Sequence, residues 1–216
     1  MKQNWKYVLS ACLMSGPFFQ IQAQNKFVPM EDVNQVVDLT LDSLEQANTM
    51  RPVPGSSRRG DHPVLFLVGN STMRTGTKGN GDNGQWGWGH EVPQYFDSNK
   101  ITVENHALGG TSSRTFYKQL WPAVKKGIRK GDYVIIELGH NDNGPFDSGR
   151  ARASIRGISP TDSLVVTIKE TGRQDTVYSY GEYLRRFVKE CKALGAQPVL
   201  LHLLRAMLGT RRIPAI

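Results

Sequence analysis

Three short polar segments hold side chains that together could carry out acyl transfer. They are 69–73 (Gly-Asn-Ser-Thr-Met), 105–110 (Asn-His-Ala-Leu-Gly-Gly) and 139–142 (Gly-His-Asn-Asp). A serine, a glycine amide and an asparagine amide in one place would provide a nucleophile and two donors to an oxyanion. A general base is also needed, because a serine hydroxyl is a weak nucleophile until a base takes its proton.

Each polar segment follows an apolar run that predicts a buried strand. Strands are expected at 63–68, 101–105, 132–138 and 198–201, and helices at 116–128 and 180–194. Strands that alternate with helices predict a parallel sheet with right-handed crossovers. Open sheets of this kind bind ligands at the carboxyl ends of their strands, where the three segments would lie. A hairpin over 163–168 and 175–178 is expected beside them.

The three segments, in this order, resemble the sequence blocks of the SGNH/GDSL hydrolases. Longer matches at 84–89 (Gly-Gln-Trp-Gly-Trp-Gly), 110–116 and 139–142 resemble the rhamnogalacturonan acetylesterase branch, and the resemblance covers about residues 62–202. It implies an α/β protein with the three-layer α/β/α, flavodoxin-like SGNH fold and a parallel sheet. The C-terminal strand and helix of that fold are missing from the expected elements.

The resemblance implies a role for one residue in each segment. Ser71 would be the nucleophile, and the Gly110 N–H and the Asn141 side chain would donate to the oxyanion. The alternatives are a Ser71 that caps a helix, a Gly109 that takes the place of Gly110, and an Asn141 that only shapes a turn.

Two neighbouring residues are expected to shape the loops around this site. Asn70 stands where family members often have Asp, and its side chain can still hold the turn by hydrogen bonds. Asp142 is expected to orient the loop that carries Asn141. Trp86 and Trp88 lie in a glycine-rich stretch. We expect at least one of them to fill the core, and the other could face a sugar.

No histidine matches the base of this family, which lies in a terminal Asp-x-x-His block. The five histidines are His62, His90, His106, His140 and His202. His106 and His140 are expected to brace turns, and His202 has Val199, not Asp, three residues before it. We therefore expect that the reading frame of the gene is truncated or shifted near residue 202. The fourth strand would then have an exposed edge, and the protein would show little or no turnover.

The function that the resemblance implies is a serine esterase that removes acetyl groups from a pectic polysaccharide. Another GDSL-type esterase or lipase, or a carbohydrate-binding relative without activity, remains an alternative. The resemblance implies no metal and no organic cofactor. The net charge of +8 could favour an acidic polymer. Nucleic acid is not expected as a partner, because aromatic and basic residues do not interleave.

The remaining expectations concern compartment and organisation. Residues 1–23 resemble a signal peptide for export, and we favour cleavage after Ala23 over lipid attachment at Cys12. Residues 24–61 would be a lead-in with a linker, 62–202 an incomplete SGNH hydrolase domain, and 203–216 an atypical tail. No apolar stretch is long enough to span a membrane. Cys191 is expected as a packed free thiol, and the sequence does not fix an oligomeric state.

Overall fold

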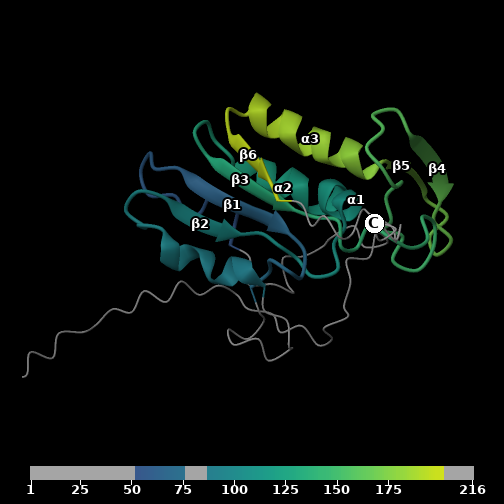
Figure 1. The fold of residues 1–216 in the computed structure, drawn as a ribbon, viewed down its shortest axis with the longest axis horizontal. Helices are drawn as coiled ribbons and strands as arrows, with labels where there is room; N and C mark the ends of the chain where they lie inside the picture. The colour runs from purple at the N-terminus through teal and green to yellow at the C-terminus, as the bar shows by residue number, and fades with distance from the viewer. Residues whose placement is uncertain (1–51, 76–86, 202–216) are drawn as a thin grey trace, which may run out of the picture.

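The computed structural model describes residues 52–75 and 87–201 (Figure 1). Its centre is a parallel four-stranded sheet in the order β2-β1-β3-β6. The strands are β1 (Val64–Gly69), β2 (Thr102–Asn105), β3 (Tyr133–Glu137) and β6 (Gln197–Leu200). All four lie where the apolar runs predict them. The signal peptide, Cys12, Trp86, His202 and the tail lie outside the described residues.

Helices cover one face of the sheet and bury its main core. They are α1 (Ser113–Thr115), the π-helical turn η5 (Phe116–Leu120), α2 (Trp121–Gly127) and α3 (Tyr180–Ala193). The rings of Phe116, Tyr117 and Trp121 pack edge-on against Phe187 of α3, which is fully buried. Cys191 lies in the same core as a free thiol, as expected, and burial raises its pKa to about 12.

The helix expected at 116–128 is interrupted and begins earlier. It starts at Ser113, because the Ser112 side chain accepts a hydrogen bond from the Thr115 N–H and so caps it. The interruption is the π-helical turn before Pro122, which stands in the first turn of α2. Proline has no N–H to donate to the preceding turn, so a continuous helix would lose a bond there.

The opposite face of the sheet is covered by short 3-10 helices. These are η3 (Trp88–His90) and η4 (Val92–Tyr95). Leu65, Leu67 and Met73 form a smaller buried cluster on this face, with Val92 of η4 packed against it. The two faces thus bury alternate residues of β1, which explains its continuous apolar sequence.

The expected hairpin is present and stands beyond the carboxyl ends of the sheet strands (Figure 1). It consists of β4 (Ser163–Thr167) and β5 (Gln174–Tyr178), which pair in antiparallel fashion. Asp175 of β5 accepts hydrogen bonds from Arg114, whose guanidinium is fully buried, and from Lys118. These ion pairs fasten the hairpin to α1 and η5.

Residues 52–61, expected as part of a linker, make specific contacts with the sheet. The Gly55 and Ser57 N–H groups each donate to the Glu104 carboxylate over 2.8 Å. Arg58 donates to Asp132 from two nitrogens, over 2.8 and 2.6 Å. The proline- and glycine-rich composition does not reveal these contacts, because the acceptors lie far away in sequence.

The outer edge of the sheet at β6 carries apolar side chains that are partly exposed. Within the described ranges β6 pairs with β3 alone, and Val199, Leu200 and Leu201 are 40–44% exposed. This agrees with the expected exposed edge of the fourth strand, a feature that promotes association between chains.

Replacing Asp132 with Ala should strongly destabilise the fold. The fully buried carboxylate accepts bonds from Arg58, from the Val64 N–H and from the Arg129 N–H. Its loss leaves a buried guanidinium unpaired, at a cost of about 3–5 kcal/mol in the free energy of unfolding measured in urea. Asp61→Ala, at an exposed position, should change it by less than about 0.5 kcal/mol. Equal effects of the two variants would contradict this account.

Glu104 should make the fold less stable in acid. Burial acts to raise its pKa, but the hydrogen bonds from His106, Ser57 and Gly55 outweigh burial and lower it below its ordinary value. The stabilisation is therefore complete above the unfolded value, about 4.3, and is lost as pH falls through the lower folded value. In urea unfolding between pH 6 and pH 3, Glu104→Gln should be less stable than the parent at pH 6 and converge with it in acid. Glu91→Gln, on the surface, should track the parent throughout.

Candidate active site

The first polar segment forms a tight turn at the end of β1. The Asn70 side chain is fully buried, and its Oδ1 accepts bonds from the Thr72 N–H over 3.1 Å and from the Thr72 hydroxyl over 2.9 Å. Asn70 thus holds the turn as expected. Ser71 lies half-buried at its tip. The Ser71 hydroxyl makes no hydrogen bond within the described ranges, so no capping role is seen there.

The second polar segment is bonded to the end of β1. The Gly69 carbonyl accepts hydrogen bonds from the Leu108 N–H over 3.1 Å and from the Thr111 hydroxyl over 3.2 Å. Gly110 lies between them with a φ of 80°, in the left-handed region that favours glycine. This conformation requires Gly110 to be glycine whether or not its N–H also binds a ligand.

The third polar segment is bonded to the second. The Asn141 amide nitrogen donates to the Thr111 carbonyl over 2.9 Å, and a primary amide has a second N–H to offer. Asp142 accepts hydrogen bonds from the Ser113 N–H, the Ser113 hydroxyl and the Ser154 hydroxyl. Asp142 therefore orients the loop as expected, and its burial raises the pKa of its carboxyl group.

A second connection joins the first and third segments through Glu137, at the end of β3. This buried carboxylate accepts a bond from the Trp88 indole N–H over 2.5 Å. It also lies 3.3 Å from the Thr72 hydroxyl, which shares its one hydrogen between Glu137 and the nearer Asn70 Oδ1. Trp88 is 36% exposed, so its ring is partly open to solvent while its nitrogen is held. In the sequence, Glu137 could have been noticed as the single acidic residue at the end of an apolar run.

Several backbone donors at this edge have no acceptor within the described residues, and the N–H of the buried Gly109 is one of them. Within the described part of the chain, neither the Ser71 N–H nor the Gly110 N–H makes a hydrogen bond, and both residues are half-buried. These unpaired N–H groups lie on neighbouring segments, so both are donors that an acceptor from outside the segments could use. The structure thus gathers the segments that carry Ser71, Gly110 and Asn141 at the carboxyl edge of the sheet.

Within the described residues, no histidine is hydrogen-bonded to the Ser71 hydroxyl, so none is in position to act as its base. His106 is buried, lies 2.9 Å from a Glu104 oxygen and stacks on Phe66 with ring centroids 5.6 Å apart. It is therefore a structural residue, as expected, but it contacts the strands β1 and β2 and not only a turn. His140 is exposed on the third segment.

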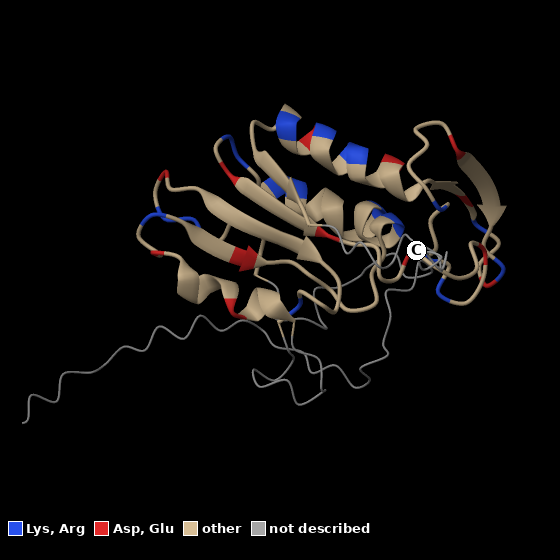
Figure 2. Cartoon of the chain, viewed as in Figure 1, with Lys and Arg blue, Asp and Glu red and all other residues tan. Residues whose placement is uncertain are grey.

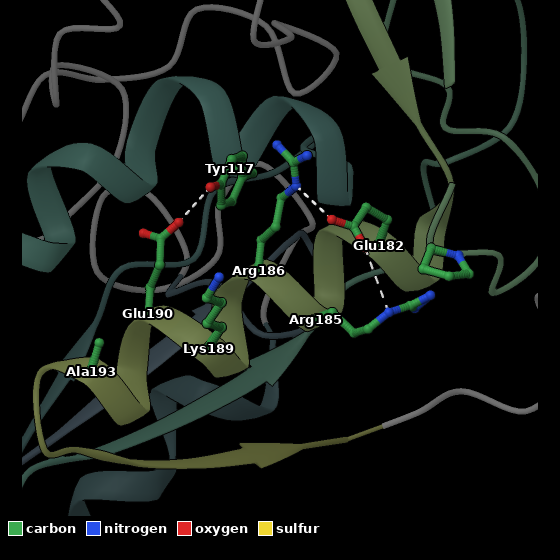
Figure 3. A pocket seen from close by; sticks show the side chains of 8 residues that line it. Tyr117, Glu182, Arg185, Arg186, Lys189, Glu190 and Ala193 are labelled. Carbon is green, nitrogen blue, oxygen red and sulfur yellow. Dashed lines mark hydrogen bonds and ion pairs between the residues drawn. The ribbon is translucent and has the colours of Figure 1, made fainter. Parts of the chain in front are cut away.

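A pocket elsewhere on the surface is lined by acidic and basic side chains, several of which pair with one another. It runs along α3 and is lined by Tyr117, Glu182, Arg185, Arg186, Lys189 and Glu190, among others (Figure 3). Glu182 pairs with Arg185 and Arg186, while Glu190 accepts bonds from Tyr117 and the Trp121 indole. Blue and red alternate along α3 in Figure 2. Because its carboxylates are already satisfied by neighbours, we do not place the site there.

Residues 52–75 and 87–201 contain neither a metal-binding cluster nor a membrane-spanning helix. No group of three or more His, Cys, Asp and Glu residues there could hold a metal ion. None of the helices in those ranges is both long enough and apolar enough to cross a membrane.

Comparisons with known proteins show the family of the chain. Residues 65–213 match the family described as GDSL-like Lipase/Acylhydrolase. A rhamnogalacturonan acetylesterase of Emericella nidulans is 31% identical over 122 residues, which are 56% of this chain and 44% of that protein. The rhamnogalacturonan acetylesterase RhgT of Bacillus subtilis is 37% identical over 138 residues, 63% of this chain and 47% of that protein. The chain thus spans less than half the length of these relatives.

Among solved structures, the chain is similar to the YxiM protein of Bacillus subtilis. The match has a TM-score of 0.46 and 26% sequence identity, and it covers 64% of this chain and 32% of that chain.

Replacing Asp142 with Ala should loosen the loop that follows the third segment. Three donors lose their acceptor in the interior, so we expect a loss of at least about 3 kcal/mol in the free energy of unfolding. Amide hydrogen exchange at Ser154 should accelerate as well. Asp142→Asn retains one acceptor oxygen and should cost less. Unchanged exchange in the alanine variant would show that the loop is held by other contacts.

Proposed function

This chain belongs to the GDSL-like lipase/acylhydrolase family, and on that premise we propose that it is a serine esterase that removes acetyl groups from a pectic polysaccharide. The observation that supports the proposal best is the pair of unpaired N–H groups, of Ser71 and Gly110, beside the Asn141 amide. Such donors stabilise the negative oxygen that forms when an ester carbonyl is attacked. The relatives named as rhamnogalacturonan acetylesterases support the choice of substrate.

The proposed reaction has two steps. The Ser71 hydroxyl oxygen attacks the acetyl carbonyl carbon, and the sugar oxygen leaves with a proton. Water then attacks the acetyl group on Ser71, releases acetate and restores the hydroxyl. In both steps the Ser71 N–H, the Gly110 N–H and the free N–H of Asn141 would bind the oxyanion. A donor of this kind is worth about 100-fold or more in rate.

The proton of Ser71 requires a base, and no histidine within residues 52–75 and 87–201 is hydrogen-bonded to the Ser71 hydroxyl. We therefore propose that these residues alone would turn over substrate slowly. Loss of one member of a Ser-His-Asp triad lowers kcat by up to about a million-fold, while donors to the oxyanion still contribute. The proposed site would thus be ready for catalysis apart from proton removal.

Imidazole in solution should restore part of the activity. Acetate release from acetylated pectin should be low without imidazole and rise with the concentration of the neutral form, because the free base can enter in place of a histidine side chain. Acetate is measured at fixed protein concentration and pH.

Ser71→Ala is the matched control, because it retains the fold but has no nucleophile. It should show only the background hydrolysis by imidazole itself. Acetate release by the variant equal to that of the parent would contradict the role of Ser71. Fast release without imidazole would show that the chain already contains a base.

A further inference from the structure

The loop over 143–156, which follows the third polar segment, is held rigidly against the candidate site. The buried Arg114 guanidinium donates from Nη1 to the Phe146 carbonyl over 2.9 Å and to the Ala153 carbonyl over 3.1 Å. Ser154 is bonded to Asp142 through both its N–H and its hydroxyl. The loop is therefore fixed at its middle and at its end, on the same groups that orient Asn141.

The backbone of this loop is strained at one position. Ala151 has a φ of 42° and is 2% exposed. A residue with a Cβ rarely adopts this left-handed conformation, which costs about 1–2 kcal/mol. Strain of this kind persists where surrounding contacts enforce it, and it is concentrated at functional sites. Here it fixes the backbone directly before Arg152.

Arg152 reaches from this loop to the segment that holds the proposed oxyanion donor. Its Nη1 donates to the Gly110 carbonyl over 2.9 Å. The side chain is half-buried, and none of the described carboxylates lies within ion-pair distance of it. A guanidinium has five N–H donors, and the bond to Gly110 uses one of those of Arg152.

The charge near Arg152 is positive. Burial and the neighbouring Arg150 lower its pKa, and Asp142 opposes them, but arginine remains protonated at neutral pH. Arg156 on the same loop is exposed. The acid of the loop, Asp147, is already paired with Lys169. The available charge thus favours an anionic ligand.

We propose that Arg152 binds the carboxylate of an acidic sugar unit next to the acetylated one. The planar fork of a guanidinium fits a carboxylate with two parallel hydrogen bonds. Because the same group holds the Gly110 carbonyl, a bound uronate would lie beside the proposed oxyanion site. This inference rests on the proposed function, and what it adds is the residue, Arg152, that would recognise the acidic unit.

The experiment measures binding of the full chain to polygalacturonate and to neutral galactan by isothermal titration calorimetry at low salt. Arg152→Gln should weaken binding to polygalacturonate by about tenfold, as expected for loss of a charge-assisted pair, and leave galactan binding unchanged. Arg129→Gln is the matched control, because Arg129 is exposed and precedes β3, at the opposite end of the sheet. It should change either affinity by less than about twofold.

Melting curves establish that each variant is folded, and Arg152→Lys provides a second variant that retains the charge without the fork. It should bind polygalacturonate more tightly than Arg152→Gln and more weakly than the parent. Equal binding by Arg152→Gln and Arg129→Gln would overturn the inference, as would equal affinity of the parent for the two polymers. A failure of the proposed function is separate: it is seen as acetate release that does not depend on Ser71.

Discussion

Parallel pairing of β2, β1 and β3 is the constraint on which the candidate site depends. In register, Gly69 of β1 lies beside Glu137 of β3, and Leu67 lies beside Asn105 of β2. Three turns that are far apart in sequence therefore leave the sheet along one edge. The Gly69 carbonyl then binds the second turn directly, through the Leu108 N–H and the Thr111 hydroxyl.

The same edge combines well-supported turns with backbone donors that have no internal acceptor. The side-chain oxygens around the turns are satisfied internally, the Asn70 Oδ1 by Thr72, Asp142 by Ser113 and Ser154, and Glu137 by Trp88. The buried Asn70 Nδ2 has no partner within the described residues. The Ser71 and Gly110 amides likewise have no acceptor within the described residues. Rigid support combined with unpaired backbone donors is the arrangement that favours binding of a developing negative charge.

The strands, the hairpin and the three turns could be predicted from the sequence because their signals are local. An apolar run followed by a polar turn predicts each strand of the sheet, and the roles of Asn70 and Asp142 follow from turn chemistry. The contacts of Arg58 with Asp132, of Arg114 with Asp175 and of Arg152 with Gly110 could not be predicted. Each joins residues at least 42 positions apart, and an arginine in a loop has no periodicity that indicates its partner. The interruption before Pro122 could have been anticipated from proline alone.

Cys191 gives the molecule a chemical reporter of its own opening. The thiol is fully buried between α3 and the sheet, and its pKa is raised to about 12. Alkylating reagents attack the thiolate, so the native protein should be almost inert to them at neutral pH. Any modification must pass through a state in which α3 has separated from the sheet. The rate of alkylation therefore measures how often the layer that supports the loops of the site comes apart.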